Sequence, residues 1–133
     1  MKILLDSHIL FWAMDQEEKI PADVLDEINN PANDVFYSVL SVWELTLKNL
    51  KNPKGMPVSG IKVAEYCDKS GFTRLPLQNE HVQQLATLNK DEGVDHKDPF
   101  DRMLICQAKA EGMTFITHDT KLSAYHESCV NII

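Results

Sequence analysis

The chain has 133 residues, of which 44% are apolar and 25% are charged, and its formal net charge at pH 7 is −7. This length predicts a single domain over residues 1–133, and this composition excludes the intrinsically disordered and fibrous classes. The negative charge counts against nonspecific nucleic-acid binding, which needs Lys and Arg at the phosphates, unless a metal ion offsets a local group of acids.

Cysteine usage and hydropathy point to the cytoplasm. The three cysteines are odd in number and show no CxxC or Cys/His ligand spacing, which predicts reduced thiols. The apolar start is broken at Asp6, too early for a signal peptide. No run approaches the roughly 20 apolar residues of a membrane helix, so we expect no membrane association.

Short apolar runs and helical patterns alternate in the first half of the chain. Lys2–Leu5 (KILL) predicts a strand buried on both faces, and a helix is predicted over 8–14. Residues 21–30 begin with proline and keep apolar residues at helical spacing, which predicts a second helix. A strand over Asp34–Ser38 and a helix over 41–51 follow.

The second half continues the alternation. The predicted elements are helix 61–70, strand 72–75, helix 79–91, helix 99–111, strand 113–117, a short helix 121–124 and strand 129–133. Gly71 and Gly93 are expected to end the helices before them. Val82, Leu85 and Leu88 form the expected apolar side of helix 79–91.

This alternation predicts an α/β fold. Crossover connections imply a mostly parallel sheet with helices on both faces, and a site beyond the carboxyl ends of the strands. The sequence contains neither GxGxxG nor GxxxxGK[ST], so dinucleotide-binding and P-loop interpretations lack their main signal.

Two acids follow predicted strands. Asp6 comes directly after KILL, and Asp119 lies in THDTK after strand 113–117. Each could cap the next helix, or ligate a metal at the edge of the sheet. Thr117 and His118 could orient a ligand or water beside Asp119, although an exposed histidine is more often structural.

Glu44 has two structural interpretations that, by themselves, are favoured over a metal site. One is a capping box with Ser41 at the start of helix 41–51, and the other is an i,i+4 ion pair with Lys48. The acid lies beside an apolar stripe formed by Trp43, Leu47 and Leu50.

Asp101 is harder to explain structurally. It shares the side of its helix with Leu104 and Ala108, the side expected to face the sheet, and a buried carboxylate is normally paired or bound to a cation. Asp98 directly precedes Pro99, and Asp-Pro is a good helix start, so capping alone would account for Asp98.

Acids from separate segments, without Cys or His at ligand spacing, favour a hard cation such as Mg²⁺ or Mn²⁺. Such clusters support attack of water on a phosphodiester, because the metal activates the nucleophile and stabilises developing charge. One carboxylate can also act as a general base.

Four motifs resemble those of PIN-domain ribonucleases of the VapC toxin type: LLDSHILFW, SVWE, HKDPFDRMLICQA and ITHD. The resemblance covers nearly the whole chain. It implies a three-layer α/β/α fold around a parallel sheet of about five strands, and a Mg²⁺- or Mn²⁺-dependent endoribonuclease. It also implies a homodimer and inhibition by a cognate antitoxin protein.

The resemblance also implies roles for individual residues. The implied catalytic and metal-binding acids are Asp6, Glu44, Asp101 and Asp119, with Asp98 as a further ligand and Ser7 and Thr117 as supporting residues. Candidate contacts to the RNA backbone are Lys48 and Arg102, then Lys51, Lys54, Arg74 and Lys97, although for any one of them a solvated surface position is the favoured alternative. Trp12 and Trp43 are expected in the core or a dimer contact rather than as stacking platforms.

Other functions stay open. A PIN-like RNA-processing nuclease without an antitoxin would carry the same acids. A haloacid-dehalogenase-type phosphatase needs a second Asp where His8 stands, and a receiver-type phospho-acceptor distributes its acids differently. A non-catalytic binding module remains if the acids fail to converge.

Overall fold

The computed structural model describes residues 1–91 and 98–133. The predicted helix stop at Gly93 and the basic residue Lys97 lie outside the described residues. None of the helices in the described part combines the length and apolar composition needed to cross a bilayer.

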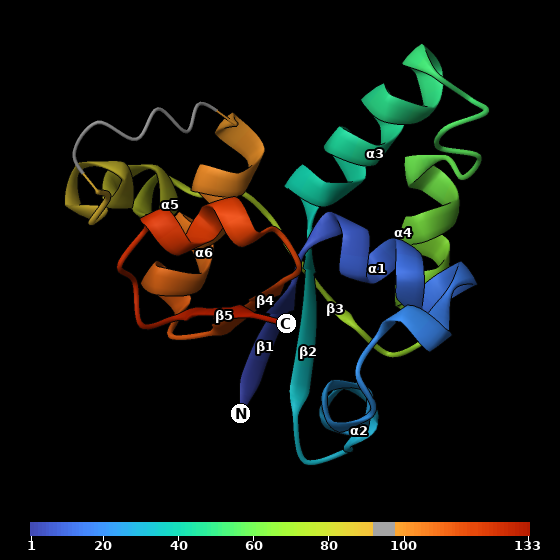
Figure 1. Cartoon of the computed structure of the whole chain (residues 1–133), viewed down its shortest axis with the longest axis horizontal. Helices are drawn as coiled ribbons and strands as arrows, with labels where there is room; N and C mark the ends of the chain where they lie inside the picture. Colours follow the sequence, from blue (N-terminus) through green and yellow to red (C-terminus); the bar gives the residue numbers. More distant parts are fainter. Residues whose placement is uncertain (92–97) are drawn as a thin grey trace.

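A five-stranded parallel sheet runs through the molecule (Figure 1). Its strands, in chain order, are β1 (Lys2–Leu5), β2 (Asp34–Ser38), β3 (Thr73–Leu75), β4 (Thr114–Thr117) and β5 (Val130–Ile132). They are arranged β3-β2-β1-β4-β5, and every pairing is parallel. The first strand is therefore central, and the carboxyl ends of β1, β2 and β4 lie side by side. The predicted α/β fold is confirmed.

Helices cover both faces of the sheet. They are α1 (Ser7–Asp15), α2 (Ala22–Asn29), α3 (Val39–Lys51), α4 (Gly60–Lys69), α5 (Asn79–Gln83) and α6 (Pro99–Glu111), with 3₁₀ turns at Glu17–Lys19, Gln84–Thr87 and Thr120–Ala124. Ile3 and Leu5 of β1 belong to a core cluster with residues of α1, α2 and α4, whereas Leu4 belongs to a second cluster with Leu104 of α6. This alternation along β1 follows from the two-residue period of a strand and produces the three predicted layers.

The start of α3 differs from the prediction. Ser38, the last residue of β2, is the N-cap, and its Oγ accepts a hydrogen bond from the Leu40 N–H at 3.0 Å. Ser41 lies inside the helix and is buried, so the predicted capping box between Ser41 and Glu44 is wrong. The chain turns directly from strand into helix, and the first available hydroxyl caps it.

The predicted helix 79–91 is also wrong in length and in orientation. The α-helix ends at Gln83 and continues only as a 3₁₀ turn, and Val82 and Leu85 are 42% and 39% exposed. The fully buried residue is His81, which accepts the Gln78 N–H at 3.1 Å and contacts Glu111 of α6 at 2.8 Å. These polar contacts, rather than the apolar spacing, orient the helix.

Candidate metal centre

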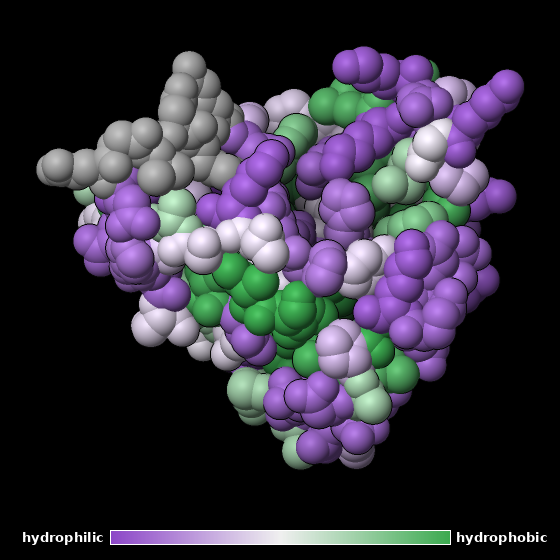
Figure 2. Space-filling view, viewed as in Figure 1, coloured by the Kyte–Doolittle hydropathy of each residue, from purple (hydrophilic) through white to green (hydrophobic). Residues whose placement is uncertain are grey.

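The acids predicted from separate segments lie around one pocket of about 310 Å³. The residues lining it are Asp6, His8, Trp12, Glu44, Lys48, Asp98, Asp101, His118 and Asp119. Figure 2 shows hydrophilic residues on both sides of the hollow between α3 and α6. Because parallel strands end at the same edge of a sheet, the fold brings the connections after β1, β2 and β4 together there.

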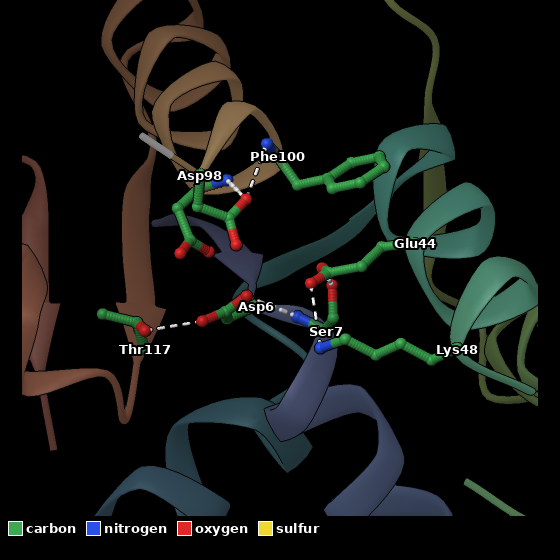
Figure 3. Close-up of polar contacts among 8 residues, drawn as sticks. Asp6, Ser7, Glu44, Lys48, Asp98, Phe100 and Thr117 are labelled. Carbon is green, nitrogen blue, oxygen red and sulfur yellow. Dashed lines mark hydrogen bonds and ion pairs between the residues drawn. The ribbon is translucent and has the colours of Figure 1, made fainter. Parts of the chain in front are cut away.

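Asp6 lies at the centre of this arrangement and is 4% exposed. It caps α1, since its Oδ1 accepts the Ser7 N–H at 2.7 Å, and its Oδ2 accepts the Thr117 hydroxyl at 2.6 Å (Figure 3). Burial raises the pKa of Asp6, the two hydrogen bonds lower it, and the charge of Glu44 raises it further. The acid is thus both a helix cap and a buried group at the carboxyl end of the central strand.

Glu44 reaches the same pocket from α3 and is 6% exposed. The Ser7 hydroxyl donates to Oε1 at 2.6 Å, and Lys48 lies 3.0 Å from Oε2 one turn further along the helix (Figure 3). The predicted ion pair with Lys48 is confirmed. Ser7 therefore links two of the predicted site acids, because its backbone N–H binds Asp6 and its side chain binds Glu44.

Asp98 is the N-cap of α6, as predicted. It accepts the backbone N–H groups of Phe100 at 2.9 Å and Asp101 at 3.2 Å, with Pro99 at the first helical position. The carboxyl group also lines the pocket. Capping and a place at the pocket are therefore compatible for this residue.

Asp101 faces the sheet, on the same side of α6 as the buried Leu104 and Ala108, and is 7% exposed. Burial, followed by the negative charges of neighbouring acids, raises the pKa of Asp101 to about 8. Those acids are, in order of effect, Asp6, Asp98, Glu44 and Asp119. Asp101 therefore lies in a buried position surrounded by like charge.

Asp119 follows β4 and lines the same pocket as the other four acids. It caps the turn Thr120–Ala124 by accepting the Lys121 N–H at 3.0 Å, and its own N–H donates to the Thr117 hydroxyl oxygen at 3.1 Å. Thr117 thus connects Asp119 to Asp6, because its hydroxyl accepts from one and donates to the other.

The donor set fits a hard divalent cation in its chemistry, since it consists of carboxylates with no thiolate. In the described residues, however, no three Asp, Glu, His or Cys side chains already stand in positions to ligate one ion. Asp6, Glu44, Asp98 and Asp119 are each turned towards a hydroxyl, ammonium or backbone N–H. Like charges separate in this way unless a cation draws them together.

Among the predicted basic contacts that the structure describes, Lys48 alone lies at the pocket. Lys48 lines it, whereas Arg102 does not, and the Nε of Arg102 is buried without a hydrogen-bond partner among the described residues. Arg74 contacts the hydroxyl of Tyr37 at 3.1 Å and Asp68 at 3.4 Å, beside β3.

Three further residues line the pocket, of which the sequence suggested only His118, as a residue that could orient a ligand or water. His8 and Trp12 are four residues apart on α1, so they share one face of the helix, and His118 follows β4. Trp12 and Trp43 were expected in the core or a dimer contact, and Trp12 does pack partly against the core. The four-residue spacing of His8 and Trp12, on the helix that Asp6 caps, is a sequence signal that could have placed both residues beside the site. The other tryptophan, Trp43, is 57% exposed and is not a core residue.

Comparisons with known proteins agree with this arrangement. The chain shares its fold with VapBC2 from Rickettsia felis, bound to a DNA fragment from the promoter, with 16% identity, a TM-score of 0.73 and coverage of 99% of this chain and 98% of that one. VapBC-5 from Mycobacterium tuberculosis gives 20% identity, a TM-score of 0.66 and coverage of 99% and 97%. A search of curated proteins found no significant match. A model of the PIN domain matches residues 3–127. The chain therefore belongs to the PIN domain family, a family of nucleases.

Proposed function

We propose that this chain is a Mg²⁺- or Mn²⁺-dependent endoribonuclease that acts as the toxin of a toxin–antitoxin pair. The observation that carries the proposal is the meeting of five carboxylates, from the connections after β1 and β4 and from α3 and α6, around one pocket. Among the described residues, one lysine, Lys48, lines the pocket with these acids. Such a set is stable in its ionised form only with an added cation.

Asp6, Glu44, Asp101 and Asp119 are the residues that would hold the metal, with Asp98 as a further ligand. A divalent ion bound there would supply Lewis-acid activation of water and neutralise charge at the scissile phosphate. The hydroxyls of Ser7 and Thr117 hold Glu44 and Asp6 by hydrogen bonds of 2.6 Å each. Such supporting partners orient the carboxylates before substrate arrives.

Lys48 and Asp101 have further roles in this proposal. The Lys48 ammonium, 3.0 Å from Glu44, lines the pocket and can contact a phosphate of the RNA. The raised pKa of Asp101, at about 8, keeps a proton on its carboxyl group near neutral pH. A cation held there would favour the ionised form of Asp101, which could then serve as a ligand or a general base.

The partners in this proposal are a cognate antitoxin and a second copy of the chain. The solved structures with this fold include VapBC assemblies, among them one bound to promoter DNA. Helices α3 and α4 also expose large apolar side chains, which is typical of surfaces covered by a partner. These are Trp43 at 57%, Leu47 at 46%, Leu50 at 74% and Ile61 at 69% exposure.

The test of catalysis uses the purified chain and single-stranded RNA, with Mg²⁺, with Mn²⁺ and with EDTA. We expect cleavage with either metal, none with EDTA, and none in the Asp6→Asn and Asp101→Asn variants. Asp26→Asn is the matched control, because Asp26 is an exposed acid of α2. Full activity in both site variants would sink the proposal, as would a failure of the wild-type chain to cleave any RNA.

The test of the antitoxin is separate. Co-expression with the product of the adjacent gene should give a complex that co-purifies and suppresses cleavage. Cleavage that persists in the complex would instead support a PIN nuclease without an antitoxin.

A further inference from the structure

One wall of the pocket differs in chemistry from the rest. His8, Trp12 and His118, here called the aromatic wall, line the pocket together with the five acids and Lys48. His8 and Trp12 come from one face of α1, and His118 from the connection after β4. The aromatic wall therefore presents flat rings within the same pocket as the acids.

Contacts within the chain hold these rings in place. The rings of Trp12 and His118 lie with centroids 4.9 Å apart at an interplanar angle of 59°, and the ammonium of Lys19 lies 5.8 Å from the Trp12 centroid. The inner part of Trp12 packs against the core. Nδ1 of His118 is 2.7 Å from the carbonyl oxygen of Ile133, which can only accept, so Nδ1 carries the proton.

The hydrogen bond through Nδ1 leaves the opposite ring nitrogen of His118, Nε2, accessible. The residue is exposed, and no hydrogen bond among the described residues engages its Nε2. His118 thus presents an unengaged ring nitrogen beside a flat ring. A ligand that stacks and also carries polar groups on its edge would satisfy both features, and a nucleobase has this combination.

The charge of the pocket supports the same conclusion. Five acids repel a phosphate backbone, and Lys48, the one Lys or Arg among the lining residues, is already paired with Glu44. In the metal-free pocket, Lys48 is thus the one phosphate–cation contact that the described lining residues offer, and further affinity there calls for contacts of another kind. Stacking on aromatic rings is such a contact, since every base has a flat face.

We propose that the aromatic wall binds a nucleobase adjacent to the scissile phosphate of single-stranded RNA. The inference rests on the proposed nuclease function and adds to it the part of the pocket that recognises the base. It makes Trp12 and His118 residues of substrate binding rather than of the chemical step.

The first experiment follows cleavage kinetics of His118→Ala, His118→Phe and the matched control His126→Ala, another exposed histidine, remote from the pocket. Loss of a stacked base contact corresponds to about 5- to 150-fold in affinity. We therefore expect His118→Ala to raise KM by that factor with little change in kcat and in thermal stability. His118→Phe keeps a flat ring and should recover most of the loss.

The second experiment does not need cleavage. The chain has two tryptophans, so Trp43→Phe leaves Trp12 as the only one. Its fluorescence is titrated in EDTA with a short RNA and with the same RNA made abasic, which carries equal phosphate charge. We expect the RNA with bases to quench Trp12 and the abasic RNA to bind about 5-fold more weakly or worse.

The outcomes separate the two proposals. Cleavage with equal binding of both RNAs, or an unchanged KM in His118→Ala, overturns the base site and leaves the nuclease intact. Base-dependent quenching without metal-dependent cleavage supports the base site and overturns the nuclease. No binding of either RNA overturns the base site as well.

Discussion

The acidic residues at the two ends of helix α6 have opposite kinds of neighbours. At the C-terminal end, the buried carboxylate of Glu127 meets the ammonium of Lys109 at 2.5 Å, and Glu111 contacts the ring of His81 at 2.8 Å. Each of these acids has its own partner within the chain. Their role is structural, because they join α6 to the segments packed beside it.

At the N-terminal end, acidic residues lie beside other acidic residues. Asp101 and Asp98 lie near Asp6, Glu44 and Asp119, and these neighbours raise the pKa of Asp101 together with burial. Glu127 lies against a cation of the chain, whereas Asp101 lies among other carboxylates, where a cation or a bound proton offsets the crowding of like charge. Four predictions sharpen this contrast.

The largest expected effect is on catalysis. Loss of supporting residues around a metal costs about 10- to 100-fold, so Asp101→Asn, which removes a proposed ligand, should cost roughly 100-fold or more in kcat/KM. Glu127→Gln should retain nearly full activity per folded molecule. RNA cleavage rates of both variants, corrected for the folded fraction, check this. Equal losses would show that the two ends of α6 do not differ in function.

The second prediction concerns pH without metal. The folded state holds the proton of Asp101 up to about pH 8, whereas the unfolded chain loses it near 3.8, the ordinary pKa of an aspartic acid. The folded state thus binds more protons between these values, and the free energy of unfolding falls as pH rises through that window. The slope reaches at most roughly 1.4 kcal/mol per pH unit for one group.

Thermal melts in EDTA across this range check the sign. Asp101→Asn should flatten the pH dependence, while Glu127→Gln should not. A wild-type melting temperature that rises with pH across the window would contradict the account of Asp101.

The third prediction concerns stability at the other end of the helix. Glu127→Gln leaves the ammonium of Lys109 without its carboxylate, which should lower the free energy of unfolding by about 1–3 kcal/mol. Asp101→Asn replaces a carboxyl group that is largely protonated near neutral pH by a neutral amide of the same size, so it should destabilise the metal-free protein less than Glu127→Gln does. Urea unfolding measures both, with Asp26→Asn as a surface control expected within about 0.5 kcal/mol of wild type.

The smallest expected effect belongs to Lys48. Its ion pair with Glu44 is of the i,i+4 type and its side chain is 41% exposed, so Lys48→Ala should change stability by no more than about 0.5 kcal/mol. KM for RNA should nevertheless rise a few-fold, since Lys48 lines the pocket. Lys51→Ala, on the same helix but outside the pocket lining, is the control. An equal change in both variants would remove the special role of Lys48.

The sequence by itself determined much of this protein. Alternating apolar runs and helical patterns predicted the parallel sheet and its layers, because burial on two faces requires that composition. The spacing around Asp101 and the Asp-Pro pair at Asp98 correctly predicted a sheet-facing acid beside a helix cap. These features depend on contacts between neighbours in the chain, which a local pattern records.

Tertiary structure alone decided the rest. The choice of Ser38 over Ser41 as cap, and of His81 over Val82 as the buried face of α5, depends on partners far away in sequence. The same is true of the pocket, where the strand order brings Asp6 and Asp119 to one edge and places Trp12 against His118. Contacts of this kind depend on the order of the strands across the sheet, because residues remote in sequence become neighbours only when the sheet assembles.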